Sequence, residues 1–139
     1  MATRTMDQAQ PARRTPPSKR PLIMVVDDDA DVLKMCDVVL EQAGFDRALA
    51  NSGEEAISLL EKVRPAVIVL DLRMPGMDGW SVAALIRKHE RTARIPILAL
   101  TGIMENVEDA ARRAGATAFI LKPLDPRRFV AAVKRLCPA

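Results

Sequence analysis

Four short apolar segments of this sequence end in side chains that could bind a metal ion or a phosphate group. In chain order, these side chains belong to Asp27, Asp28, Asp71, Thr101 and Lys122. Carboxylates are preferred ligands of Mg²⁺, which usually keeps several waters beside one or two of them. A hydroxyl and an ammonium group can hold the oxygens of an anion. Together these groups have the chemistry for phosphoryl transfer, provided that the fold gathers them.

The three carboxylates would repel one another if they met without a cation. At about 5 Å each pair would repel by roughly 3 kcal/mol at an effective dielectric constant near 20. A divalent ion offsets that repulsion, so we predict a Mg²⁺ site formed by Asp27, Asp28 and Asp71, with Asp27 orienting the waters of the ion. Asp71 is the predicted nucleophile, and Thr101 and Lys122 are predicted to hold the oxygens of the acyl phosphate formed on it.

Short apolar strands alternating with amphipathic helices must position these residues. The patterns predict strands over residues 22–26, 45–50, 66–70, 96–100 and 117–121. They predict helices over residues 31–43, 52–63, 80–90 and 105–114, and a last helix capped by Asp125. This alternation indicates a doubly wound, flavodoxin-like α/β fold, with a five-stranded parallel sheet in the order 2-1-3-4-5 and helices on both faces. Ligands of such sheets bind beyond the carboxyl ends of the strands.

Charge divides the chain into a basic tail and a nearly neutral body. Residues 1–20 hold five basic side chains and one acidic one, which gives +4, whereas the whole chain of 139 residues has a net charge of +3. The body therefore has a charge of −1. Because the tail also contains three prolines and little apolar periodicity, we predict that residues 1–20 are disordered and that residues 21–137 form the folded domain.

Taken together, the motifs resemble those of response-regulator receiver domains, the phosphoacceptor half of two-component systems. The matching segments are residues 25–29, 69–79, 98–102 and 119–123, and the resemblance extends over about residues 21–136. It implies a signalling protein that takes a phosphoryl group onto Asp71 from a phosphohistidine of a histidine kinase or a histidine phosphotransfer protein.

The resemblance also assigns roles that the residue types alone do not. The backbone carbonyl of Arg73 would complete the metal site, and the Lys122–Pro123 peptide bond would be cis. Phosphorylation would draw Thr101 inward and let the ring of Phe119 turn into the vacated space, which is a two-state switch biased by one ligand. The output surface would be the fourth helix, the fifth strand and the fifth helix, which would pass the signal to a downstream protein or onward by phosphotransfer.

Two residues depart from what rapid hydrolysis of the phosphoprotein would need. Arg73 lies two residues after the acceptor, where an acid or amide would orient a hydrolytic water more readily. Ile103, two residues after Thr101, is apolar and could shield the phosphate. We therefore expect a phosphoacceptor with at most slow self-dephosphorylation, and not an enzyme.

Composition limits the remaining properties. No segment approaches the roughly 18 apolar residues of a membrane span, and no secretory signal is visible, so a cytoplasmic location is expected. Acidic residues lie among the basic pairs of the last two helices, and aromatic residues are scarce, so direct DNA binding is not expected. We expect a stand-alone receiver that is a monomer or a weak dimer formed on phosphorylation.

Three other classes of protein share parts of this pattern. An aspartyl-phosphate hydrolase uses the same Asp, Lys and Thr chemistry, but it usually has a second acid where this chain has Arg73. A phosphorylation-independent interaction module would not need the intact acidic cluster. A flavodoxin-like cofactor binder would need a glycine-rich or hydroxyl-rich phosphate loop after the first strand, and Asp27 and Asp28 stand there instead.

Overall fold

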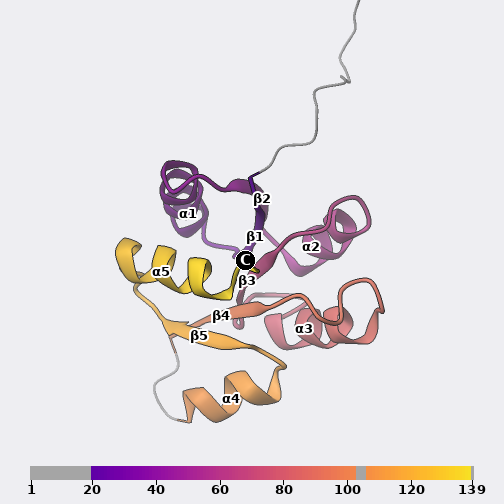
Figure 1. The fold of residues 1–139 in the computed structure, drawn as a ribbon. Coiled ribbons are helices and arrows are strands. Elements are labelled where there is room, and N and C mark those ends of the chain that lie inside the picture. The colour runs from indigo at the N-terminus through magenta and orange to yellow at the C-terminus, as the bar shows by residue number, and fades with distance from the viewer. Residues whose placement is uncertain (1–19, 103–105, 139) are drawn as a thin grey trace, which may run out of the picture.

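The computed structural model describes residues 20–102 and 106–138 as five strands alternating with five helices (Figure 1). The strands are β1 (Leu22–Val26), β2 (Asp46–Ala50), β3 (Val67–Asp71), β4 (Ile97–Thr101) and β5 (Ala118–Leu121). The helices are α1 (Ala30–Gln42), α2 (Gly53–Leu60), α3 (Gly79–Lys88), α4 (Val107–Arg113) and α5 (Pro126–Leu136). All strand pairs are parallel, and the order β2-β1-β3-β4-β5 confirms the predicted doubly wound sheet.

Two apolar layers hold the helices on the sheet. In Figure 1, α1 and α5 lie on one face of the sheet, α2 and α3 lie on the other, and α4 lies beside β5. Alternate residues of β3 supply both layers, since Ile68 and Leu70 pack on the α2–α3 side and Val67 and Val69 on the α1–α5 side. Every residue of β3 is buried, as expected for the central strand of a sheet covered on both faces.

Acidic and hydroxyl side chains begin four of the helices. Asp29, Ser52, Asp78 and Asp125 each accept a hydrogen bond from a backbone N–H in the first turn of the helix that follows. Asp29 Oδ1, for example, accepts from the N–H of Asp31 at 2.9 Å. Asp29, which follows Asp27 and Asp28 in the sequence, thus starts α1.

Helix α3 begins against the backbone of β3. A Cβ atom on Gly79 would collide with the carbonyl oxygen of Asp71 and with the Cα atom of Leu72. The Gly79 N–H donates to the Leu72 carbonyl at 3.3 Å, which fixes this approach. Only glycine allows the helix to start so close to the end of the strand, so Gly79 determines the shape of the loop beyond Asp71.

Helices α2 and α3 end two or three residues earlier than the sequence pattern predicts. Helix α2 ends at Leu60, and the N–H groups of Glu61 and Lys62 donate to the carbonyls of Ser58 and Leu59, which tightens the last turn. Helix α3 ends at Lys88 because the backbone of His89 is extended, with ψ of 131°. Both ends lie at the edge of the sheet away from Asp71.

The predicted tail lies outside the described residues except for Arg20. Arg20 Nη2 donates to the Phe45 carbonyl at 2.9 Å, and Arg20 Nε donates to the Gly44 carbonyl at 3.0 Å. These bonds attach the start of β1 to the end of α1. Among the helices of the described ranges, none has both the length and the apolar character needed to cross a bilayer.

Candidate metal and phosphoryl site

Three carboxylates meet at the carboxyl ends of the two central strands. Ligand oxygens of Asp27, Asp28 and Asp71 all lie within 4.8 Å of one another. The register of β1 and β3 causes this, because Val26 is the neighbour of Leu70 and each strand continues by one residue to an aspartate. Asp27 is fully buried and Asp71 is 3% exposed, whereas Asp28 is exposed. The cluster is therefore open to solvent mainly on the side of Asp28.

Lys122 is the cation that faces the two buried acids. Its Nζ atom lies 2.9 Å from Asp27 Oδ2 and 3.2 Å from Asp71 Oδ2. β5 is separated from β3 by β4, so the lysine stem crosses the end of β4 to reach both carboxylates. The backbone N–H of Lys122 donates to the Thr101 carbonyl at 2.9 Å, which fixes the position of the lysine backbone beside the end of β4.

Each buried carboxylate is also held by a backbone N–H group two residues further along the chain. Asp27 Oδ1 accepts from Asp29 N at 2.9 Å, and Asp71 Oδ1 accepts from Arg73 N at 3.1 Å. One oxygen of each side chain is thus fixed by its own loop, while the second is directed at Lys122. The loop after Asp71 also brings the backbone of Arg73 next to the cluster, with its side chain in solvent.

Charges in the site are only partly balanced. Burial, and to a lesser degree the negative charge of Asp27, raises the pKa of Asp71 to about 6, although the Arg73 N–H and Lys122 both act to lower it. Burial lowers the pKa of Lys122, but its close contacts with the negative charges of Asp27 and Asp71 outweigh burial and raise the pKa overall. The cluster of three acids thus has one ammonium group beside it, paired with Asp27 and Asp71.

The donor set fits a divalent cation with oxygen ligands. Asp27 Oδ2 is buried, and although Lys122 Nζ lies close by, the pair is poorly aligned for a hydrogen bond, so this oxygen has no well-aligned donor among the described residues. A hard cation beside Asp27, Asp28 and Asp71 would neutralise the excess negative charge. It would also give the buried Asp27 side chain a positively charged partner. The residues present therefore suit Mg²⁺.

A family model for the "Response regulator receiver domain" matches residues 23–134, which include the whole cluster and all five strands except Leu22. The chain belongs to this family.

Curated relatives of this receiver domain include longer regulators. The DNA-binding response regulator MtrA of Mycolicibacterium paratuberculosis is 36% identical over 116 residues, which are 83% of this chain and 50% of the relative. The chain thus spans about half the length of the first relatives it matches. A 14.6 kDa protein of Leptolyngbya boryana is 36% identical over 118 residues, which cover 90% of its length.

Solved receiver structures share the fold over nearly their whole length. Chemotaxis response regulator CheY4 of Vibrio cholerae has a TM-score of 0.80 and 28% identity, covering 85% of this chain and 99% of its own. The receiver domain of sensor histidine kinase PA1611 from Pseudomonas aeruginosa, with a TM-score of 0.77 and 26% identity over 84% of this chain and 97% of its own, has a magnesium ion coordinated in its active site cleft.

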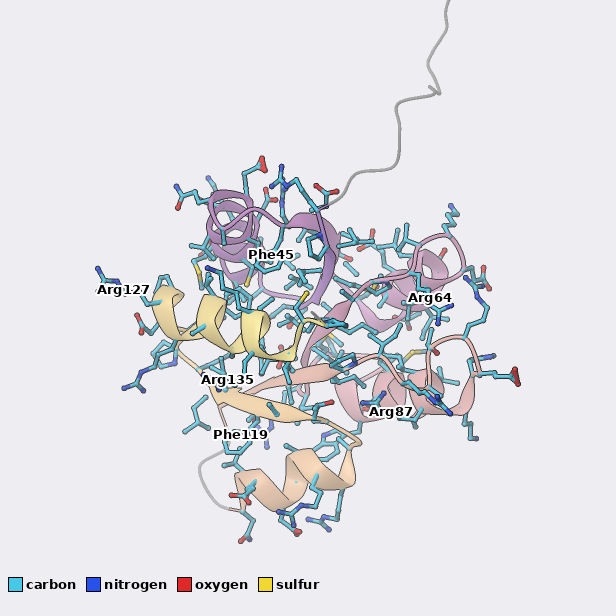
Figure 2. All side chains as sticks on the ribbon, in the orientation of Figure 1. Phe45, Arg64, Arg87, Phe119, Arg127 and Arg135 are labelled. Atoms are coloured by element: carbon cyan, nitrogen blue, oxygen red, sulfur yellow. The ribbon has the colours of Figure 1, made fainter. Side chains whose placement is uncertain are left out.

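The predicted switch residues of the receiver domain, Thr101 and Phe119, lie on the face of the sheet opposite that of Asp71. Asp71 is the neighbour of Leu100, so the next residue of β4, Thr101, starts on the opposite face. Phe119 is the neighbour of Ala99 and therefore shares the face of Thr101. Thr101 is buried, and Phe119 is half-buried against the apolar layer of α2, α3 and α4 (Figure 2). The predicted switch pair thus lies on one side of the sheet.

Some predictions concern the loops around the site. The Lys122–Pro123 peptide bond is cis, the isomer that the resemblance implied. Ile103, the predicted shield of the phosphate, lies outside the described residues. Cys36 is buried in the α1–α5 layer, and burial, followed by the charge of Asp27, raises the pKa of its thiol to about 12, so it is a neutral core residue.

Sequence reasoning did not find Gly79 as part of the site. The sequence pattern indicates only that Gly79 precedes a helix predicted from residue 80. Glycines in a turn are common, and the close approach to Asp71 depends on how α3 returns to the sheet, which no local pattern of the sequence encodes.

Proposed function

We propose that this receiver domain accepts a phosphoryl group on Asp71 from a phosphohistidine of a partner kinase or phosphotransfer protein, with Mg²⁺ bound at the acidic cluster. The observation that supports this is the buried Asp71 carboxylate, which lies within 4.8 Å of two further acids and 3.2 Å from the Lys122 ammonium group. A nucleophilic carboxylate, a cation and a set of metal ligands are the groups that phosphoryl transfer to an acid requires.

The chemistry of the transfer follows from these groups. An oxygen of ionised Asp71 attacks phosphorus while the bond from phosphorus to the donor imidazole breaks, and the imidazole leaves with the electron pair. Asp27, Asp28, Asp71 and the Arg73 carbonyl would hold Mg²⁺, which supplies positive charge to the phosphoryl oxygens. Lys122 provides a second positive charge, and the Arg73 N–H keeps the side chain of Asp71 oriented.

Phosphorylation would change a surface of this domain that a partner protein recognises. The new anion offers oxygens to the Thr101 hydroxyl and to Lys122, which until then is shared between Asp27 and Asp71. Movement of Thr101 would open space on its own face of the sheet, and Phe119 lies on that face. We propose that this pair converts the phosphorylated state into a changed β4–β5–α4 surface that a downstream protein recognises, without direct DNA contact by this domain.

The lifetime of the phosphorylated state follows from the loop after Asp71. The side chain of Arg73 is exposed and offers no carboxylate or amide to a hydrolytic water. We therefore propose slow self-dephosphorylation, no enzymatic turnover, and a cytoplasmic protein that is monomeric or forms a weak dimer on phosphorylation. Radioactive label lost from the purified phosphoprotein within seconds would contradict the slow reaction.

Incubation of the full chain with acetyl phosphate and Mg²⁺, followed by intact-mass measurement, tests the proposal. We expect the addition of one phosphoryl group, abolished by a chelator or by Asp71→Ala. A matched control is Asp78→Ala, which removes an acid that only caps α3 and should leave the modification intact. An unmodified wild-type chain would favour the phosphorylation-independent interaction module, and modification of Asp71→Ala would place the acceptor elsewhere.

A further inference from the structure

The end of the sheet opposite Asp71 carries a pocket with three arginines on its wall. The hollow, of about 440 Å³, lies where the strands begin, and its basic residues are Arg64, Arg91 and Arg94. All three residues are exposed, and none of their guanidinium groups forms a hydrogen bond or ion pair within the described ranges. Prolines form much of the remaining wall: Pro21, Pro65, Pro96 and Pro138.

A second, narrower hollow adjoins the first. It has a volume of about 260 Å³, lies between the ends of α2 and α3, and shares Arg91 with the arginine pocket. Its apolar walls are Ile57 and Leu60 of α2 and Leu85 and Ile86 of α3. The two hollows are neighbours that share Arg91, and we call them together the amino-end surface. Figure 2 shows Arg64 of this surface on the opposite side of the sheet from Arg127 of α5.

Acidic residues of the amino-end surface do not neutralise its arginines. Glu61 lines the apolar hollow and Glu90 lines the arginine pocket, but neither lies within ion-pair distance of Arg64, Arg91 or Arg94 in the described part of the chain. Guanidinium groups bind carboxylates with two parallel hydrogen bonds and are only weakly hydrated, so such groups at the rim of a hollow favour an anionic ligand.

We propose that the amino-end surface docks a segment of a partner protein in which a large apolar side chain lies beside acidic residues. The hollow between α2 and α3 has the size and lining to hold one apolar side chain, and the arginines can then pair with neighbouring carboxylates. A nucleic acid fits less well, because neither hollow is lined by Phe, Tyr or Trp on which a base could stack.

Docking there would leave the phosphoacceptor accessible. The five residues of β3 separate the two ends of the sheet by about 16 Å. The Asp71 end and the amino-end surface are therefore distinct, and a partner held at one leaves the other open to a phosphodonor. The proposal does not depend on phosphorylation of Asp71.

Titration of the ¹⁵N-labelled full chain with a synthetic helical peptide tests the proposal by nuclear magnetic resonance. The peptide has leucines at every third or fourth position and glutamates elsewhere. We expect saturable shift changes at Ile57, Leu85 and Thr92, which line the apolar hollow. Peptides with Gln for every Glu, or with Ser for every Leu, should bind about tenfold more weakly or not at all.

Matched charge reversals separate specific docking from attraction by net charge. The double variant Arg91→Glu/Arg94→Glu should bind the acidic peptide about tenfold more weakly than the wild type. The double variant Arg127→Glu/Arg128→Glu, on α5, should bind it with an affinity within about twofold of the wild type. Acetyl phosphate should modify both double variants as it does the wild type, which keeps this test separate from that of the phosphoacceptor. Circular dichroism melting should show that both remain folded.

Several outcomes would overturn the proposal. They are equal weakening by the two double variants, equal binding of the Gln peptide, shift changes that map to α5, or no saturable change at about 1 mM peptide. Binding of a single-stranded oligonucleotide at Arg91 and Arg94, with no binding of the peptide, would also overturn it and would identify a nucleic-acid surface instead.

Discussion

The two ends of the sheet use charge in opposite ways. At the carboxyl end, two buried aspartates share one lysine, and each also accepts a backbone hydrogen bond. At the amino end, Arg64, Arg91 and Arg94 are exposed and form no ion pair with other described residues. Buried charges need defined partners, whereas exposed charges are stabilised by water. Substitutions of charged residues at the carboxyl end should therefore change the stability of the fold. Substitutions of the arginines at the amino end should not.

The largest effect on stability is expected from a bulkier side chain at the carboxyl end of the sheet. Gly79→Ala places a methyl group against the backbone of Asp71 and Leu72 and should reduce the free energy of unfolding by about 3 kcal/mol. Gly102→Ala is the matched control, because a Cβ atom there meets nothing within 4 Å, and it should change stability by less than about 0.5 kcal/mol. Urea denaturation measures both, and equal effects would refute the role of the close approach.

Removal of Lys122, the cation that faces the buried acids among the described residues, should have the next largest effect. Lys122→Met leaves Asp27 and Asp71 buried without their shared partner, so the free energy of unfolding in chelator should fall by about 2–3 kcal/mol. Saturating Mg²⁺ should restore part of it, because the metal replaces the lost charge. Lys134→Met on α5, an exposed lysine without an ion pair in the described residues, should have almost no effect.

The stability of the fold should also depend on pH through Asp71, at the carboxyl end of the sheet. The pKa of Asp71 is raised to about 6, above about 3.9 in an unfolded chain, so between these values the folded state binds more protons. Ionised Asp71 therefore destabilises the metal-free fold increasingly as pH rises from about 4 to about 6. The stability of Asp71→Asn relative to wild type should rise over that range, by at most about 2–3 kcal/mol. A difference in unfolding free energy that stays constant with pH in chelator would contradict the raised pKa.

The smallest effect is expected at the amino end. Arg91→Gln and Arg94→Gln should each change the free energy of unfolding by less than about 0.5 kcal/mol, because neither guanidinium group has a described partner to lose. Thermal melts at low and high salt measure this. A loss comparable with that of Lys122→Met would show that these arginines hold the fold together, and the contrast between the two ends would fail.

Local patterns of the sequence were enough to predict the fold and the gathering of the acids. Parallel strands place their carboxyl ends at one edge, so Asp27, Asp28 and Asp71 could be brought together from strand positions alone. Lys122 could be assigned to the same edge by that rule. The distances, the shared ion pair and the burial depend on the register of β5 and on side-chain packing, which the sequence pattern does not specify.

Arg87 illustrates what local patterns could not reveal. In the sequence it belongs to a charged helix end, which is typical of a solvated surface. In the structure its guanidinium group is half-buried and donates to the carbonyls of Ala93, Ile95 and Gly115 at 2.7–3.0 Å. Gly115 is 28 residues away, so the partners exist only after α4 and β5 have been placed. Figure 2 shows Arg87 on α3; its partners belong to the loop between α3 and β4 and the loop between α4 and β5.

The alternation of side chains along β4 makes the length of this strand critical. Leu100 lies on the side of the sheet that carries Asp71, and Thr101 lies on the side that carries Phe119. Insertion of a single residue within β4 would turn each later side chain to the other face, so the hydroxyl and the aromatic ring would no longer share one side. Evolution can therefore lengthen or shorten the loops on either side of β4 more freely than the strand itself.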